Sequence, residues 1–142
     1  MKASEIMTSH DLWVIGESSD VIEVSRMMAE HNVGAIPVLD EMGRLEGIIT
    51  DRDICCRVVA LGKSYETPVR DIMSRSVQSV HPDTDLKEVE AIMRDRKVRR
   101  VPVVDEQMRL KGFIALADLA RHIDSRKEAR TVAEVLEDVS KD

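Results

Sequence analysis

An internal repeat constrains this sequence of 142 residues more than any other feature. Residues 33–40 (VGAIPVLD) align with residues 98–105 (VRRVPVVD), and the same register of 65 residues relates 20–54 to 85–119 without a gap. Self-similarity of this kind indicates one structural unit that is used twice. We therefore expect the chain to fold as two similar halves.

The apolar pattern changes in the same order within each copy. It begins with a short strand-like run, at 12–15 and at 77–80. A helix is then expected to start at Asp20 and at Asp85, each with a glutamate three residues on, Glu23 and Glu88, as in a capping box. Apolar side chains follow at helical spacing: Val21, Val24, Met27 and Met28 in the first copy, and Leu86, Val89, Ile92 and Met93 in the second.

Two apolar runs separated by a polar turn come next in each copy, which predicts a β-hairpin. The runs are 35–39 and 45–49 in the first copy, and 101–104 and 110–114 in the second. A second helix is expected after each hairpin, at 51–61 and 116–123. Each half thus has the order β-α-β-β-α, and we predict a mixed α/β fold of the α+β kind.

The composition is typical of a soluble globular protein, with 43% hydrophobic and 34% charged residues. The N-terminus has no apolar signal segment, and no run of about 18 apolar residues occurs. The adjacent Cys55 and Cys56 are poorly placed for a disulfide, which favours a reducing compartment. We interpret them as a small buried hydrophobe with an incidental neighbour. We predict a cytoplasmic protein without membrane contact.

The sequence gives no support for catalysis or for a metal site. Asp51 and Asp53 lie two positions apart in an expected helix, so their side chains diverge and do not form an acid/base pair. No phosphate-binding glycine loop or nucleophile motif is found. The histidines are dispersed without metal-ligand spacing, at His10, His31, His81 and His122. We predict a non-enzymatic protein that requires no cofactor.

The ordered motifs, found twice, resemble the cystathionine-β-synthase (CBS) domain family. They are Ile-Pro-Val-Leu-Asp at 36–40 and Val-Pro-Val-Val-Asp at 101–105, the glycines Gly47 and Gly112, and Thr50-x-x-Asp53 beside Ala115-x-x-Asp118. The resemblance covers residues 6–122 and is to a stand-alone pair of CBS domains, a Bateman module. We expect a first repeat with its N-terminal strand at 1–64, a second repeat at 65–124, and a helical tail at 125–142.

This resemblance implies that the two repeats pack with pseudo-twofold symmetry and leave two clefts for adenosine-containing ligands: AMP, ADP, ATP, S-adenosylmethionine and sometimes NAD. An aspartate would accept hydrogen bonds from both ribose hydroxyls. The implied primary cleft contains Ile48, Thr50, Asp53, Met73, Ser74, Gln78, Val98 and Arg99. The implied second cleft contains Met7, Thr8, Gly34, Arg99, Arg100, Phe113 and Asp118. Ala115 lacks a hydroxyl, so we expect the second cleft to bind more weakly. A homodimer formed through helix faces is implied as well.

Some of these residues also have a purely structural interpretation. Thr50 and Asp53 form a capping box by sequence. Ala115 offers no capping hydroxyl to Asp118, which favours a ligand role for this aspartate, although an acidic residue is stabilising in any first helical turn. Residues 94–97 are a basic, solvated helix end, whereas Arg99 and Arg100 precede a strand and could bind a phosphate bidentately.

The segment beyond the repeat carries an apolar stripe at helical spacing, made of Val132, Val135, Leu136 and Val139. We expect this tail to dock on its own domain or on a second subunit; a partly frayed terminal helix is the alternative.

The sequence therefore predicts a cytoplasmic sensor that binds an adenosyl ligand and signals to an unidentified protein partner. The alternative function is a ligand-free CBS-pair scaffold or stress-associated interaction module, which Ala115 favours. Nucleic-acid binding depends on the basic cluster at 94–100 alone, and the net charge of −6 opposes it.

Overall fold

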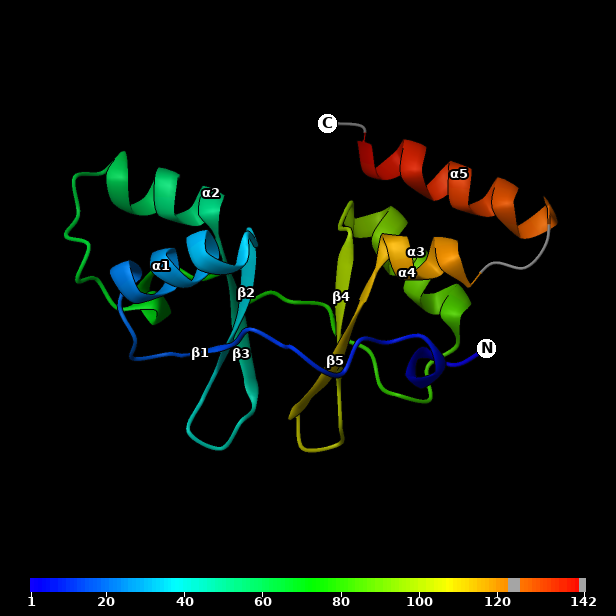
Figure 1. The fold of residues 1–142 in the computed structure, drawn as a ribbon, viewed down its shortest axis with the longest axis horizontal. Helices are drawn as coiled ribbons and strands as arrows, with labels where there is room; N and C mark the ends of the chain where they lie inside the picture. The colour runs from blue at the N-terminus through cyan, green and yellow to red at the C-terminus, as the bar shows by residue number, and fades with distance from the viewer. Residues whose placement is uncertain (123–125, 141–142) are drawn as a thin grey trace. The chain divides into compact units, whose positions relative to one another are not determined.

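The computed structural model describes residues 1–122 and 126–140, with the backbone alone over 126–132. The chain forms two compact units, each with its own hydrophobic core (Figure 1). Trp13–Val77 make the first, which we call the β1–β3 unit. Met1–Leu12 and the residues from Gln78 onward make the second, the β4–β5 unit.

The β1–β3 unit is a three-stranded sheet with its helices packed against it. β1 (Ile15–Gly16) runs parallel to β2 (Ala35–Leu39), and β2 pairs antiparallel with β3 (Leu45–Thr50). α1 (Val21–His31) joins β1 to β2, α2 (Asp51–Ile54) follows β3 and continues as the π-helical turn η2 (Cys55–Val59), and η3 (Val69–Asp71) comes later. Val24, Ile36 and Ile49 are fully buried between these layers.

The β4–β5 unit repeats this plan around a two-stranded sheet. Antiparallel β4 (Arg100–Val104) and β5 (Leu110–Ala115) are accompanied by η1 (Ala3–Glu5), α3 (Leu86–Arg96), α4 (Leu116–Arg121) and α5 (Arg126–Ser140). In place of the strand expected at 77–80, Val80 makes one parallel bridge to Val103. The two expected hairpins and the mixed α+β class are confirmed.

The N-terminal segment of each repeat packs on the sheet of the other copy. Residues 1–12 join the second copy through bridges from Lys2 to Asp85 and from Thr8 to Phe113. Residues 66–77 join the first copy, where Ser74 exchanges two backbone hydrogen bonds of 2.9 Å with Ile48. The β4–β5 unit is therefore assembled from two separate pieces of sequence, whereas the β1–β3 unit is one continuous stretch that reaches past the first copy to Val77.

Gly47 and Gly112 allow these crossing segments to approach the strands closely. A Cβ at Gly47 would lie 2.5 Å from the carbonyl oxygen of Ser74, and a Cβ at Gly112 would lie 2.6 Å from that of Thr8. Real Cβ atoms do not come so near to backbone, so a side chain at either position would push the crossing segment away. This contact explains why both copies have glycine here.

The helix boundaries differ in part from the expected ones. Asp20 and Asp85 are the N-caps of α1 and α3, as expected, and accept from the backbone N–H groups of Glu23 and Lys87 at 3.0 and 2.9 Å. The expected capping box is half formed at α1, where the side chain of Glu23 returns no bond. It is not formed at α3, where Asp85 accepts from Lys87 instead of Glu88. The helix expected at 51–61 is α-helical only to Ile54, because the backbone then changes to π-type bonding.

The C-terminal tail docks on its own chain. α5 lies against α3 and α4 (Figure 1), and Val135 enters the core of the β4–β5 unit with 1% of its surface exposed. Val139 packs against the same core, whereas Leu136 is exposed; Val132 belongs to the residues whose side chains are not described. Among the described residues, no helix has the length and apolar character needed to cross a membrane.

Candidate ligand-binding site

The junction between β3 and α2 holds a complete capping box. Thr50 Oγ1 accepts from the backbone N–H of Asp53 at 3.1 Å, and Asp53 Oδ2 accepts from the backbone N–H of Thr50 at 3.0 Å. These bonds satisfy two donors at the start of the helix and fix both side chains. The structural interpretation of this pair is therefore confirmed; its ligand role stays a prediction.

The second oxygen of Asp53 retains capacity to accept further bonds. Among the described residues it pairs with Arg57, whose Nε lies 3.8 Å from Asp53 Oδ1, beyond hydrogen-bond distance. The same guanidinium donates from Nη1 to the backbone carbonyl of Ile72 at 3.0 Å. Arg57 thus ties the carboxylate to the crossing segment, and a carboxylate oxygen has two lone pairs with which to accept donors.

Three other predicted residues of the primary cleft lie in the same β1–β3 unit. Ile48 and Ser74 are joined by their backbone bonds, and Met73 fills the space beside Gly47. Ile48 and Thr50 point to the same face of β3, because side chains alternate along a strand, and both are partly exposed there. The structure therefore brings Ile48, Thr50, Asp53, Met73 and Ser74 into one neighbourhood.

The remaining predicted residues of that cleft, Gln78, Val98 and Arg99, belong to the β4–β5 unit. Gln78 is already engaged within its own unit, where its Oε1 accepts from Arg96 Nη2 at 3.3 Å. Val98 is 36% exposed in the turn before β4. Their place beside Thr50 and Asp53 stays a prediction.

At the equivalent junction between β5 and α4, both oxygens of the aspartate already accept hydrogen bonds. Asp118 is 4% exposed, and its Oδ2 accepts from the backbone N–H of Ala115 at 2.8 Å. Its Oδ1 accepts from the guanidinium of Arg121. We expected Asp118 to have no capping role, because Ala115 has no hydroxyl group. This expectation is wrong: the carboxylate of Asp118 caps the helix by accepting from the backbone N–H of Ala115.

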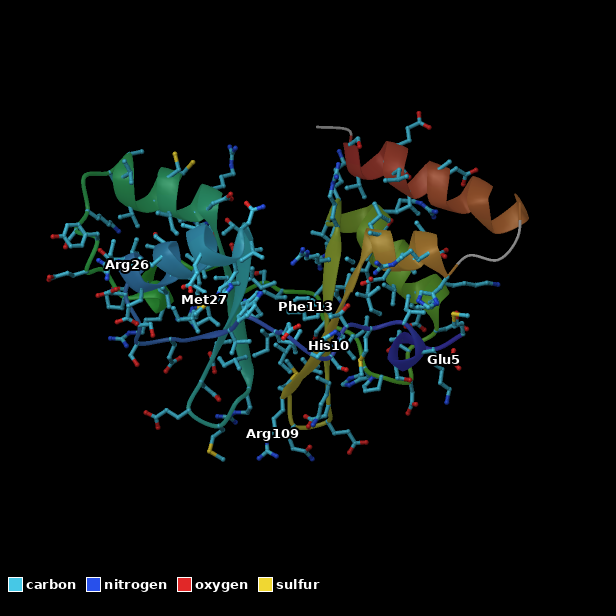
Figure 2. All side chains as sticks on the ribbon, in the orientation of Figure 1. Glu5, His10, Arg26, Met27, Arg109 and Phe113 are labelled. Carbon is cyan, nitrogen blue, oxygen red and sulfur yellow. The ribbon has the colours of Figure 1, made fainter. Side chains whose placement is uncertain are left out.

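Other predicted residues of the second cleft lie around this junction. Thr8 and Phe113 exchange backbone hydrogen bonds of 2.8 and 2.9 Å where the N-terminal segment crosses β5 (Figure 2), and Met7 packs beside Gly112. Arg99 and Arg100, both exposed, precede and begin β4. Gly34 belongs to the β1–β3 unit, so its role in this cleft stays a prediction.

The two arginines Arg57 and Arg121 were missed by sequence reasoning. Their spacing from the aspartates, four residues for Arg57 and three for Arg121, is the spacing at which helical side chains meet. That signal was present in the sequence. The structure adds the difference between the copies: Arg121 bonds directly to Asp118, whereas Arg57 stands farther from Asp53.

The expectation for the cysteines is wrong in one respect. Cys55 and Cys56 are both free and exposed on η2, so neither is a buried hydrophobe. In the part of the chain that the structure describes, no three histidine, cysteine, aspartate or glutamate side chains gather as metal ligands do.

The repeat, the crossing segments and the capped strand ends together define a pair of CBS domains. The chain belongs to this family: the family model described as CBS domain matches residues 3–59 and 69–125. It is similar to the CBS domain-containing protein YhcV of Bacillus subtilis, with 40% identity over 115 residues that cover 81% of each chain.

Solved structures of similar fold include proteins with bound adenosyl compounds. CBSX2 in complex with AMP has a TM-score of 0.75 at 28% identity, over 84% of this chain and 93% of that one. The CBS domain pair of MJ0100 in complex with 5′-methylthioadenosine and S-adenosyl-L-methionine has a TM-score of 0.70 at 28% identity, over 85% and 94%. Hypoxic Response Protein I, with two coordinated zinc ions, has a TM-score of 0.78 at 33% identity, over 87% and 100%.

Proposed function

We propose that this protein is a non-enzymatic, cytoplasmic regulatory module that binds an adenosine-containing ligand and signals its occupancy to a protein partner. The candidate ligands are AMP, ADP, ATP and S-adenosylmethionine. We expect the protein to form a homodimer. The observation that carries the proposal is the carboxylate of Asp53, which is fixed by Thr50 yet keeps acceptor capacity on Oδ1. The complexes of CBSX2 and MJ0100 support the adenosyl class.

The chemistry of the proposal is the recognition of a ribose. A charged acceptor held rigid at a strand end gives up little conformational freedom when two hydroxyl groups donate to it. Thr50 can add its hydroxyl as a donor, since its oxygen already accepts from Asp53. Asp118 has less capacity left because Arg121 occupies its second oxygen. We therefore propose that the Asp53 site binds more tightly than the Asp118 site.

Calorimetric titration of the full chain with AMP, ATP, S-adenosylmethionine and NAD tests the proposal. Asp53→Asn removes the charge but keeps an oxygen that can accept from Thr50. It should weaken AMP binding by about 1.5 to 3 kcal/mol, the range for hydrogen bonds to charged groups. Asp118→Asn is the matched control in the other repeat and should cost less.

Replacing AMP by 2′-deoxy-AMP makes the test specific to the ribose contact. The lost hydroxyl should weaken binding to the natural chain but have little further effect in Asp53→Asn, because an amide NH2 has replaced the oxygen that was not bonded to Thr50. If removing the hydroxyl weakened binding equally in both proteins, the ribose would not contact Asp53. If none of the ligands binds at millimolar concentration, the sensor function is wrong and the ligand-free scaffold takes its place.

A further inference from the structure

The C-terminal end of the docked helix α5, which is its negative end, lies beside Arg94 and Arg99 of the β4–β5 unit. Its last turn contains Asp138, whose Oδ2 lies 3.2 Å from Arg94 Nε, and Ser140, whose Oγ lies 3.5 Å from Arg99 Nη2. The carbonyl end of a helix has a partial negative charge, which adds to that of the acidic side chains. Figure 1 shows this end of α5 lying toward β4.

A groove of about 290 Å³ lies at the same place. Arg99 and Arg100 form its basic side, Ala115, Ala117 and Ala120 line it with small apolar groups, and Leu136 closes it from α5. Leu136 is 43% exposed, so this part of α5 borders the groove without being buried. An anionic group that entered the groove to reach Arg99 would meet Leu136, and it would compete with Ser140 for the guanidinium.

The other repeat lacks both the arginines and the acidic helix. At the same register its residues are Ala29 for Arg94, Gly34 for Arg99 and Ala35 for Arg100. The corresponding groove of the β1–β3 unit, about 420 Å³, is lined in the described structure by α1, α2 and the turn before β2. The basic groove and the acidic helix end therefore occur together in one repeat, where they are electrostatically matched.

We propose that the last turn of α5 is an intramolecular competitor for phosphate at Arg99, the arginine next to Arg100 on the basic side of the groove. A phosphate group forms charge-assisted, bidentate bonds with guanidinium, which are stronger than the long bond from Arg99 to the neutral Ser140 hydroxyl. Phosphate bound at Arg99 would replace the bond to Ser140 and so weaken the docking of the last turn. The identity of the phosphate carrier as an adenine nucleotide rests on the proposed function; the competition itself does not.

Competition of this kind links the binding of phosphate at Arg99 to the exposure of the apolar stripe of α5. Among the described side chains of α5, Val135 lies in the core of the unit and Val139 packs against it, so full displacement of the helix would uncover both. Because coupling is reciprocal, phosphate shifts the docking equilibrium of α5 by the same factor by which docked α5 lowers the affinity for phosphate. A change that loosens α5 should therefore raise this affinity. The released stripe is then available to a partner protein.

Asp138→Asn tests the competition, with Asp83→Asn as a matched control. Asp83 makes the same kind of exposed ion pair, with Lys2, away from α5. Exposed pairs contribute little, so Asp138→Asn should tighten AMP binding about two- to five-fold. Adenosine, which has no phosphate, should bind both variants and the natural chain equally. Asp83→Asn should leave the affinity for AMP unchanged.

Hydrogen exchange of the α5 amides is the direct measurement. Inorganic pyrophosphate should accelerate exchange in α5 relative to sodium chloride of equal ionic strength, and Arg99→Ala with Arg100→Ala should abolish this effect. If AMP does not bind but pyrophosphate still loosens α5, the proposed function fails and the competition stands. If AMP binds in an Asp53-dependent manner while neither anion changes α5 exchange, the competition is wrong.

Discussion

At the scale of single residues, aspartates organise both repeats through bonds to backbone N–H groups. In each hairpin turn one aspartate accepts two such bonds: Asp40 from Met42 and Arg44, and Asp105 from Gln107 and Arg109. The backbone N–H of Arg44 is the main cause that lowers the pKa of Asp40 below its ordinary value of 3.8, and the backbone N–H of Arg109 does the same for Asp105.

These lowered pKa values predict a loss of stability in acid. A carboxylate whose folded pKa lies below its unfolded pKa stabilises the fold fully above the unfolded value, and this contribution disappears as the pH falls through the folded value. Asp40→Asn should therefore be less stable than the natural chain at pH 7, and the difference should shrink below about pH 4. Urea unfolding at pH 7 and pH 3 measures it. A difference that is constant with pH would show that the charge of Asp40 does not contribute.

At the scale of elements, the sequence predicted the hairpins, the first helices and their N-caps, because their signals are local. Residues near one another in the chain set these features. The exposure of Cys55 and Cys56 and the π-helical turn were not predictable, since packing of η2 against the rest of the unit decides them. The pair Thr50 and Asp53 was predictable as a cap, whereas the open Oδ1 of Asp53 depends on where Arg57 lies.

The close approach at Gly47 is a property of elements, and it predicts an unusual penalty for alanine. Gly→Ala normally stabilises slightly through the unfolded state when the site has room. At Gly47 the new Cβ would lie 2.5 Å from Ser74 O, so Gly47→Ala should destabilise by about 1 to 3 kcal/mol, as overpacking does. Gly16→Ala is the control, because its nearest atom would be Ser19 Oγ at 3.9 Å. Chemical unfolding of both variants compares them, and equal stabilities would contradict the steric argument.

At the scale of the whole molecule, each repeat depends on a segment that the sequence register assigns to the other. Repeat alignment places residues 1–12 with the first copy, yet they pack on the second, and residues 66–77 pack on the first. The sequence could not predict this exchange, because both segments carry the same pair of residues, Ile6-Met7 and Ile72-Met73, and no local signal states which sheet they join. Long-range packing decides it, through cores that contain Ile6 in one unit and Ile72 in the other.

Ile6 and Ile72 form a matched pair with which to test this arrangement. Ile6 is 6% exposed and Ile72 is 1% exposed, so truncation of either to alanine should destabilise its unit by about 2 to 5 kcal/mol. Ile6→Ala should accelerate hydrogen exchange chiefly in β4 and β5, although Ile6 belongs to the first repeat by sequence. Ile72→Ala should act chiefly on β2 and β3. The local opening that exchange reports is confined to the unit that loses the contact, as long as the other unit stays folded. If Ile6→Ala instead loosened β2 and β3, residues 1–12 would pack on the first repeat. That result would contradict the exchange of N-terminal segments between the repeats.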